Sequence, residues 1–414
     1  MKRSIFFFLI PILFFDLAPA QAQEMDVLLK GAHLIDPKNK IDGKMDVAFL
    51  EGKIIQVSPV ITPGKNTKVI DVTGFYVAPG FIDMHAHVFN GTDTDAYIAN
   101  GLTAVPPDGF TFRAGVTTAV DAGSSGWRNF PEFKKQTIDH AKTRILALLN
   151  IVGTGMFSRY KEQDVSDMNP VMTANMIKKL YPTIIVGIKA AHYWGDFTQV
   201  DMAVEAGKLA HVPVMVDFGG SKPPLSIQEL FERHLRPGDV FTHCFGQLKG
   251  REAIVDIQTK KVKPFVLAAR ERGIIFDVGY GGISFAFSQA VPAVKNGFFP
   301  NSISTDLHIG SMNNAMKDML SVMSKFLTMG MDLNAVIAAS TANPAREIKR
   351  ESLGNLSVGS GADIAIFSMR KGQFGYFDYT GYKIPGSQRI ECEMTIKAGK
   401  IVYDLNGLAY TFYR

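Results

Sequence analysis

Cysteine is scarce in this chain, with two residues among 414, and the formal net charge is only +5. A single pair of cysteines cannot build the disulfide framework of a small secreted scaffold. Cys244 lies in a predicted core strand next to His243, so we expect Cys244 and Cys392 to be buried free thiols. The chain also lacks basic runs interleaved with aromatic residues, which argues against a nucleic acid partner.

The apolar run near the N-terminus is too short to cross a bilayer as a permanent helix. A basic segment precedes it and an Ala-x-Ala site follows it, a combination typical of a secretory signal peptide. In order, the three parts are Lys2-Arg3, Ile5–Phe15 and Ala20-Gln21-Ala22. We expect cleavage after Ala22, which gives a secreted or periplasmic protein without a stable membrane anchor. No cysteine lies near this site, so no lipid anchor is expected, and the length of the run disfavours an uncleaved anchor.

Hydrophobic residues make up 46% of the chain and charged residues 20%, which indicates a globular protein with a sizeable core. The length suits a large barrel with a smaller companion domain. Between the two ends, apolar runs alternate with helical patterns, and eight such units predict an α/β fold of the (β/α)8 TIM-like barrel type. The candidate strands are 81–87, 116–121, 145–151, 184–190, 214–218, 240–245, 274–278 and 302–306.

Both ends of the mature chain contain short β-rich segments separated by turn signals. We expect these ends to pair into one small β-sandwich, which the rest of the chain splits. The predicted organisation is a signal peptide at 1–22, a first sandwich part at 23–78, the barrel at 79–357 and a second sandwich part at 358–414. A methionine-rich stripe at 315–327 has helical spacing, and we interpret it as core packing.

The most informative motif is Gly80–His87, in which two histidines end an apolar run. Side chains alternate along a β-strand, so His85 and His87 point the same way. Two neutral imidazoles aimed at one point can bind a zinc-like ion. The alternative is a pair of polar residues that simply end a strand.

Further polar residues end other predicted strands, at the edge where the active sites of such barrels lie. Lys189 follows a run suited to a buried strand, where a charged amine is costly. It either reaches the barrel mouth or pairs with Asp306, or it reacts with carbon dioxide to give an anionic carbamate that bridges two metals. His243 could be a satisfied core residue, and Asp306 could accept backbone hydrogen bonds. Taken together, however, residues of these types at the ends of different strands predict a metal-binding site.

Six motifs together carry a resemblance to a known family. They are Ala78–His87, Ala114–Thr118, Gly187–Lys189, Thr242–Cys244, Ser304–His308 and Asn343–Arg346. On these motifs the chain resembles the amidohydrolase superfamily of metal-dependent hydrolases. Within it, the chain resembles the amidohydrolase/deacetylase group, which is related to dihydroorotases and D-aminoacylases. The resemblance covers nearly the whole mature chain, and the family's β-sandwich from both termini matches the expectation for the two ends.

The resemblance implies a centre of two divalent metal ions, with zinc in first place and manganese or iron as alternatives. His85, His87 and Asp306 would hold the first ion, His243 would bind the second, and carboxylated Lys189 would bridge the two. A metal-bound hydroxide would attack the amide carbonyl. Asp306 would take the proton of the water and pass it to the leaving nitrogen, as general base and then general acid.

The sequence departs from the family pattern at two positions. The fifth strand usually ends with a histidine ligand to the second ion, but here that position holds Asp217. Aspartate can bind zinc, yet its harder oxygen could favour manganese or iron, or leave a single metal bound. Otherwise Asp217 would only orient a ligand. The second departure is Tyr280, where the nearest relatives often carry histidine, and this tyrosine could contact substrate or simply pack.

The loop after Lys189 supplies a histidine and two aromatic residues, His192, Tyr193 and Trp194. These residues could line an aromatic-friendly pocket, and His192 could replace the missing histidine. The candidate substrate-binding residues are His192, Tyr193, Tyr280 and His308.

These observations predict an exported metal-dependent hydrolase of a non-peptide carbon–nitrogen bond, with an N-acyl amino acid or a related small amide as substrate. Hydrolysis of a cyclic amide, an ester or a lactone would use the same chemistry. A different class is a catalytically silent, metal-poor scaffold that binds a small ligand or assembles as an oligomer. Asp217 is the main feature that favours this class. The other five predicted ligands favour the enzyme, because a scaffold has no chemical need for that set. A homo-oligomer would be ordinary for this family.

Overall fold

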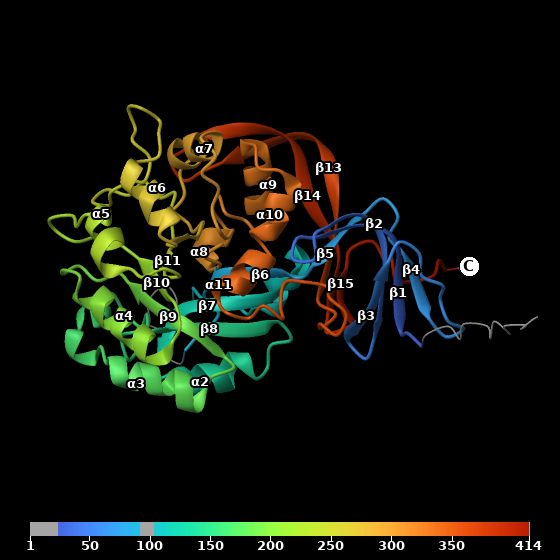
Figure 1. Cartoon of the computed structure of the whole chain (residues 1–414), viewed down its shortest axis with the longest axis horizontal. Helices are drawn as coiled ribbons and strands as arrows, with labels where there is room; N and C mark the ends of the chain where they lie inside the picture. Colours follow the sequence, from blue (N-terminus) through green and yellow to red (C-terminus); the bar gives the residue numbers. More distant parts are fainter. Residues whose placement is uncertain (1–23, 92–102, 414) are drawn as a thin grey trace, which may run out of the picture.

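The computed structural model describes residues 24–91 and 103–413, so the predicted signal peptide at 1–22 lies outside the described residues. The chain forms a barrel surrounded by helices and, beside it, a sheet built from both ends of the chain (Figure 1). This architecture confirms the predicted α/β barrel with a terminal β-domain.

Seven parallel strands form the barrel sheet and follow one another in chain order from β6 to β12. They are β6 (Phe81–Ala86), β7 (Val116–Gly126), β8 (Arg144–Asn150), β9 (Ile185–Ala191), β10 (Val214–Asp217), β11 (Val240–Phe241) and β12 (Ile275–Phe276). Every residue of β6, β7 and β9 is buried, as expected for parallel strands that are covered on both faces. Each strand begins within one residue of a predicted strand.

The segment predicted as the eighth strand, 302–306, closes the barrel without being a regular strand. Ser302 forms a parallel bridge with Asp277, and Leu307 forms one with Ala86. The hydroxyls of Ser302 and Ser304 both donate to the carboxylate of Asp277 at 2.8 Å. Short polar side chains compete with backbone ladders in this way, which explains the irregular geometry. The strand prediction is therefore corrected here to an irregular closing segment.

Helices cover the outside of the barrel (Figure 1). The described helices are α1 (Asp108–Thr111), α2 (Phe130–Phe133), α3 (Pro170–Asn175), α4 (Thr198–Ala210), α5 (Ile227–Glu229), α6 (Pro264–Glu271), α7 (Phe287–Lys295), α8 (Ile309–Met312), α9 (Met319–Met329), α10 (Leu333–Ala338) and α11 (Ala342–Glu347). The carboxylate of Asp318 caps α9 by accepting the N–H of Ser321 at 2.7 Å, and left-handed Gly330 ends it. The methionines of α9 are buried, which confirms that the stripe is core packing.

The terminal sheet joins β15, β14, β13, β5, β1, β2 and β3 in that order, and β4 pairs with β1. Its strands are β1 (Val27–Asp36), β2 (Ile41–Leu50), β3 (Lys53–Ser58), β4 (Lys68–Asp71), β5 (Tyr76–Pro79), β13 (Ile364–Phe377), β14 (Lys383–Lys397) and β15 (Lys400–Asp404). The two ends of the chain meet where β5 pairs antiparallel with β13. This domain has an apolar cluster of its own.

The hairpin of β13 and β14 reaches beyond the terminal sheet and over the barrel (Figure 1). The hydroxyl of Tyr379 at its tip donates to the carbonyl of Gln247 at 2.6 Å. The carboxylate of Asp378, also at the tip, accepts the N–H of Phe287 at the start of α7, at 2.7 Å. The segment predicted as the second sandwich part therefore also contributes to the barrel wall.

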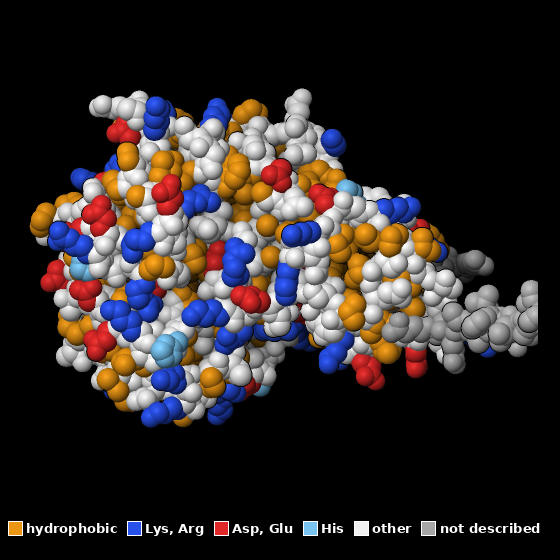
Figure 2. Space-filling view, in the orientation of Figure 1, with side chains coloured by type: hydrophobic (Ala, Val, Ile, Leu, Met, Phe, Trp, Pro, Cys, Tyr) orange, Lys and Arg blue, Asp and Glu red, His pale blue; other side chains and the backbone are white. Residues whose placement is uncertain are grey.

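Cys244 and Cys392 are buried and unpaired, as expected. Basic and acidic side chains are mixed over the face shown in Figure 2, which differs from the single basic stripe of a nucleic-acid-binding surface. Among the described helices, none combines the length and the hydropathy that a membrane span requires.

Candidate active site

A cavity of about 500 Å³ opens at the carboxyl ends of the barrel strands, where the predicted metal ligands gather. All six of them line it: His85, His87, Lys189, Asp217, His243 and Asp306. Five are buried, and the side chain of the sixth, Asp217, is 16% exposed. The structure thus brings together residues that the sequence places at the ends of separate strands.

In both histidines of the HxH motif, Nδ1 contacts a hydroxyl group of the protein. In His85, Nδ1 lies 3.0 Å from the hydroxyl oxygen of Thr242, which itself donates to Asp277 at 2.7 Å. Because that hydroxyl hydrogen is already used, Nδ1 of His85 carries the ring hydrogen and Nε2 offers a lone pair. In His87, Nδ1 lies 3.0 Å from Oγ of Ser124. Burial lowers the pKa of His85 to about 3, which keeps this ring neutral and able to bind a metal.

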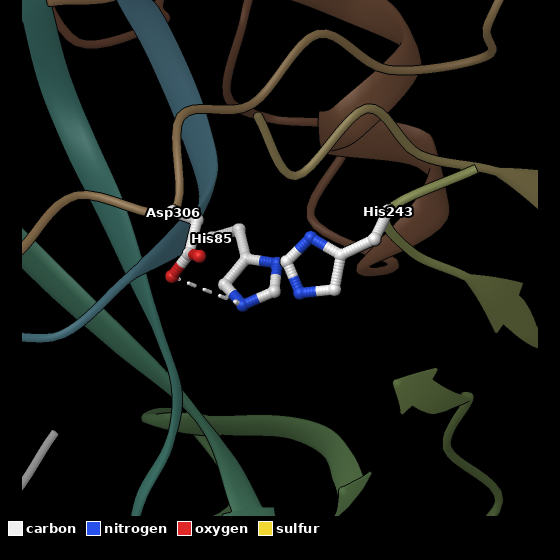
Figure 3. A group of neighbouring side chains, drawn as sticks. All are labelled: His85, His243 and Asp306. Atoms are coloured by element: carbon white, nitrogen blue, oxygen red, sulfur yellow. Dashed lines mark ion pairs between the residues drawn. The ribbon is translucent and has the colours of Figure 1, made fainter. Parts of the chain in front are cut away.

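His243 and Asp306 come from other parts of the barrel and approach His85 (Figure 3). Nδ1 of His243 donates to the carbonyl of Gly279, so its Nε2 also offers a lone pair. Oδ1 of Asp306 lies 3.0 Å from Nε2 of His87 and 3.7 Å from Nε2 of His85. His243 and Asp306 both have left-handed backbone conformations, each with φ of 54°. Such strain outside glycine is uncommon and concentrates at functional sites.

This donor set fits a divalent metal ion. Three ligand atoms, one from each of His85, His243 and Asp306, lie within 4.8 Å of one another. Neighbouring ligand atoms around a tetrahedral zinc ion lie about 3.3 Å apart, given bonds of about 2.0–2.2 Å. Oδ1 of Asp306 lies 3.7 Å from Nε2 of His85 and 3.0 Å from Nε2 of His87, and these two separations bracket that value. Burial alone would raise the pKa of Asp306, but the surrounding imidazoles outweigh it and hold the pKa well below its usual value.

Lys189 is fully buried against the first of these ligands. Its Nζ lies 3.1 Å from Nε2 of His85 and 3.7 Å from Sδ of Met215. Burial lowers the pKa of Lys189, although the carboxylates of Asp217 and Asp306 oppose the shift. Within the described residues, Asp306 forms its ion pairs with histidines. The predicted alternative of an ion pair between Lys189 and Asp306 is therefore not found.

Asp217, at the departure from the family pattern, contacts two imidazoles. Its Oδ2 lies 3.4 Å from Nε2 of His243 and 3.2 Å from Nε2 of His192, and its Oδ1 lies 3.4 Å from Nη1 of Arg251. On the other side of His192, Nδ1 lies 3.1 Å from both carboxylate oxygens of Glu162, which is buried. Glu162 lies in a single turn of 3-10 helix and Arg251 in a loop, so neither shows a periodic signal by which it could be found from the sequence.

His308 also lines the cavity, but its ring is oriented differently from those of the predicted ligands. Its Nδ1 accepts the backbone N–H of Gly310 at 3.1 Å, so the neutral ring carries its hydrogen on Nε2. That Nε2 lies 3.8 Å from Oδ2 of Asp306. His308 is therefore placed to donate a hydrogen bond within the cavity rather than to bind a metal.

Two of the predicted substrate contacts, Tyr193 and Tyr280, are not among the described residues that line the cavity. Tyr280 is buried, and its hydroxyl donates to the carbonyl of Phe377 at 3.1 Å. Its ring stacks on Phe285 at 4.3 Å, and Nζ of Lys325 lies 2.9 Å from its hydroxyl. The sequence places Tyr280 after a strand but does not fix the direction of its ring. We therefore correct its role from substrate contact to core packing.

The rest of the cavity lining is mostly apolar and carries a few basic groups. Its apolar side chains are Met156, Trp194, Phe218, Leu248 and Ile283, and its basic ones are Arg159, Lys249 and Arg251. Sequence analysis singled out Trp194 from its position after Lys189. The others could not be found from the sequence, because they come from loops whose path the sequence does not show.

Comparisons with known proteins agree with this geometry. Residues 287–402 match the amidohydrolase family. A deacetylase of Agrobacterium fabrum is 33% identical over 383 residues, which are 87% of this chain and 90% of that protein. A solved adenine deaminase superposes with a TM-score of 0.82 at 30% identity, covering 92% of this chain and 100% of the other. A solved dihydroorotase superposes with a TM-score of 0.79 at 30% identity, covering 91% and 99%.

The barrel and the histidines and carboxylates at its strand ends define a metal-dependent barrel hydrolase. More specifically, the chain belongs to the amidohydrolase superfamily. It is a hydrolase of carbon–nitrogen bonds other than peptide bonds.

Proposed function

We propose that this chain is an exported deacetylase that removes the acyl group from an N-acyl amino acid or a related small amide. The observation that carries the proposal is the convergence of six ligand-type side chains on one cavity at the strand ends. The name of the Agrobacterium relative, a deacetylase, supports this choice of reaction within the superfamily.

The apolar and basic side chains of the cavity lining favour a substrate with one apolar and one anionic part. Trp194, Phe218 and Ile283 offer apolar surface, and Lys249 adds a positive charge to the same lining. A carboxylate next to the scissile amide would be attracted by that charge. These features favour N-acyl amino acids with an apolar side chain over neutral amides.

We propose two zinc ions as the metals, since imidazole and carboxylate are the ligands that zinc commonly takes. His85, His87 and Asp306 would hold one ion, His243 and Asp217 the other, with carboxylated Lys189 between them. The buried amine of Lys189 supports this modification: its nitrogen adds to carbon dioxide and loses a proton, which leaves an anionic carbamate. When bound, the metals would polarise the amide carbonyl and lower the pKa of a water molecule.

Asp306 is placed to move the proton. Its carboxylate lies beside the imidazoles of His85 and His87, where it can accept a proton from the attacking water. The same carboxyl group can then return that proton to the leaving nitrogen. Nε2 of His308, 3.8 Å from Oδ2 of Asp306, can donate a hydrogen bond to the substrate beside the reacting bond.

Export is proposed from the signal pattern at 1–22. We expect the mature protein to begin at Gln23 and to be recovered outside the cytoplasm, which fractionation and N-terminal sequencing would test. The homo-oligomer that the resemblance implies stays a prediction for the same preparation, to be tested by its hydrodynamic size.

The test of the reaction is a screen of mature protein produced with zinc and bicarbonate. The substrates are N-acetyl amino acids, cyclic amides and acetate esters, and release of free amine or acid is measured. Amine release from N-acetyl amino acids that is lost on chelation and restored by zinc supports the proposal. Turnover confined to cyclic amides or esters contradicts deacetylation while keeping the metal-dependent hydrolase.

A further inference from the structure

His192 lies at the end of β9, and its ring is oriented like those of the predicted ligands. In His85 and His243, Nδ1 is turned to a hydrogen-bond acceptor and Nε2 faces the cavity. In His192, Nδ1 faces the carboxylate of Glu162 and Nε2 faces Oδ2 of Asp217. A carboxylate behind Nδ1 is the common way in which proteins orient a metal-binding imidazole.

We propose that His192 supplies the imidazole that is missing from β10 and binds the second metal ion together with His243 and Asp217, while Glu162 positions it. This inference rests on the proposed function, because it assumes a second metal ion. The histidine ligand has then moved from the end of β10 to the end of the neighbouring strand, β9. Asp217 keeps a place at the metal as the shared partner of both imidazoles.

Two distances within this group, both measured from Asp217, match those in a metal's coordination sphere. Oδ2 of Asp217 lies 3.2 Å from Nε2 of His192 and 3.4 Å from Nε2 of His243. Both values are close to the separation of about 3.3 Å between neighbouring ligands of tetrahedral zinc. Two imidazole nitrogens from two other segments of chain therefore lie at the spacing from Oδ2 of Asp217 that ligands of one ion have.

The backbone around His192 is held in the conformation that aims the ring. His192 has a left-handed φ of 61°, as do His243 and Asp306 at 54°. The side chain of Gln163 holds the turn at both ends: its Nε2 donates to the carbonyl of His192 at 2.8 Å, and its Oε1 accepts the N–H of Trp194 at 2.8 Å. Gln163 follows Glu162 directly, so one short segment fixes both the backbone and the ring of His192.

The charges around the group also suit a cation. Glu162 is fully buried, and both of its carboxylate oxygens lie 3.1 Å from Nδ1 of His192. A buried carboxylate is costly unless it is paired. Asp217 adds a second carboxylate. Its Oδ1 contacts Arg251, and its Oδ2 contacts the two imidazoles. The alternative is a salt-bridge network that only stabilises the fold, and metal binding separates the two.

The experiment is a zinc titration of the mature metal-free protein by calorimetry, with bound zinc counted by elemental analysis. The variants are His192→Ala, Glu162→Gln and the control His234→Ala. His234 is a matched control for His192, because its Nδ1 also contacts a carboxylate, that of Asp201 at 2.6 Å. His234 is not among the residues that line the cavity. We expect His192→Ala to lose one zinc ion per chain or bind it at least 100-fold more weakly. Glu162→Gln should weaken the same ion about 10- to 100-fold, the usual effect of removing such a carboxylate, and His234→Ala should match the wild type.

A rescue variant guards against damage to the fold. In the double variant His192→Ala with Asp217→His, an imidazole returns to β10, and we expect the lost zinc ion to return with it. Cobalt-substituted wild type and His192→Ala should also differ in their visible spectra, since a nitrogen ligand is removed. Unchanged zinc affinity and stoichiometry in His192→Ala would overturn the assignment of His192, whether the wild type binds one ion or two. A wild type that binds no zinc, manganese or iron would overturn the proposed function itself.

Discussion

Asp306 is the residue on which the proposed chemistry depends most. Its carboxylate faces the imidazoles of His85 and His87 through one oxygen and His308 through the other. Its backbone is left-handed, and its pKa lies well below the usual value. A substitution that keeps the shape but removes the charge therefore isolates its proton-transfer role.

We expect Asp306→Asn to lower kcat by about 10²- to 10⁴-fold, the range typical of a lost acid–base group. Thermal unfolding should change little, because the amide fills the same volume. The measurement is kcat on a confirmed substrate together with circular dichroism. Asp201→Asn, whose side chain is 55% exposed on α4, is the control and should keep full activity. Wild-type turnover in Asp306→Asn would show that another group moves the proton.

Glu347, on α11, is buried, and neither of its carboxylate oxygens has a hydrogen-bond partner within the described residues. Burial raises the pKa of Glu347 from 4.5 to about 8. Between these two values the folded state keeps a proton that the unfolded state has lost. The contribution of Glu347 to the free energy of unfolding is therefore fully present below pH 4.5 and is lost as the pH rises to about 8.

We expect Glu347→Gln to be more stable than the wild type near pH 8, by on the order of 2–4 kcal/mol, with a smaller difference near pH 5. Urea unfolding at several pH values measures this difference. Glu351→Gln is the control, because Glu351 is exposed. A difference between Glu347→Gln and the wild type that does not grow with pH would show that the buried carboxyl does not titrate as described.

The predicted metal ligands could be found from the sequence because they end apolar strands of a barrel. The parallel topology then brings strand ends together regardless of their distance along the chain. Glu162 and Arg251 could not be found in this way, since the path of a loop depends on tertiary packing. Tyr280 shows a different limit: its place in the sequence was informative, but the direction of its ring depends on Phe285 and Lys325.

At the scale of elements, the hairpin of β13 and β14 joins the terminal sheet to the barrel. Asp378, which is buried at its tip, accepts the N–H groups of Phe287 and Thr380 at 2.7 and 2.9 Å. The N–H of Phe287 lies in the first turn of α7, where the helix has no acceptor of its own. The tip thus fastens the hairpin to a helix of the barrel.

We expect Asp378→Ala to lower the free energy of unfolding by about 1–3 kcal/mol, because buried N–H groups lose their acceptor. Asp378→Asn keeps one side-chain oxygen and should lose less. Urea unfolding of both variants at one pH measures the effect. If Asp378→Ala is as stable as the wild type, the tip contacts do not fasten the hairpin.

Apolar periodicity located the regular elements well, since each of the seven barrel strands begins within one residue of its predicted start. It failed for the closing segment at 302–306. There, serine hydroxyls bind Asp277 and replace part of the ladder. The reach of the β13–β14 hairpin was also missed, because alternation along a strand predicts pairing but not what lies beyond the sheet.

At the scale of the whole molecule, metal binding and stability should be linked. His87 and Asp306, the proposed ligands of one ion, come from different parts of the barrel, as do Asp217 and His243 for the other, so each ion would cross-link the barrel. We expect zinc at a hundredfold excess over its dissociation constant to raise the free energy of unfolding by about 2.7 kcal/mol for each site. Urea unfolding with zinc and with chelator measures this. Identical curves would contradict binding at the strand ends.

Metal content per chain is the measurement that tests the central claim most directly. The mature protein would be produced with bicarbonate and zinc, manganese or iron, freed of loosely bound ions and submitted to elemental analysis. We expect two ions per chain, consistent with a carboxylated Lys189 between them. Protein that is folded but holds no ion under any of these conditions would contradict a metal-dependent hydrolase.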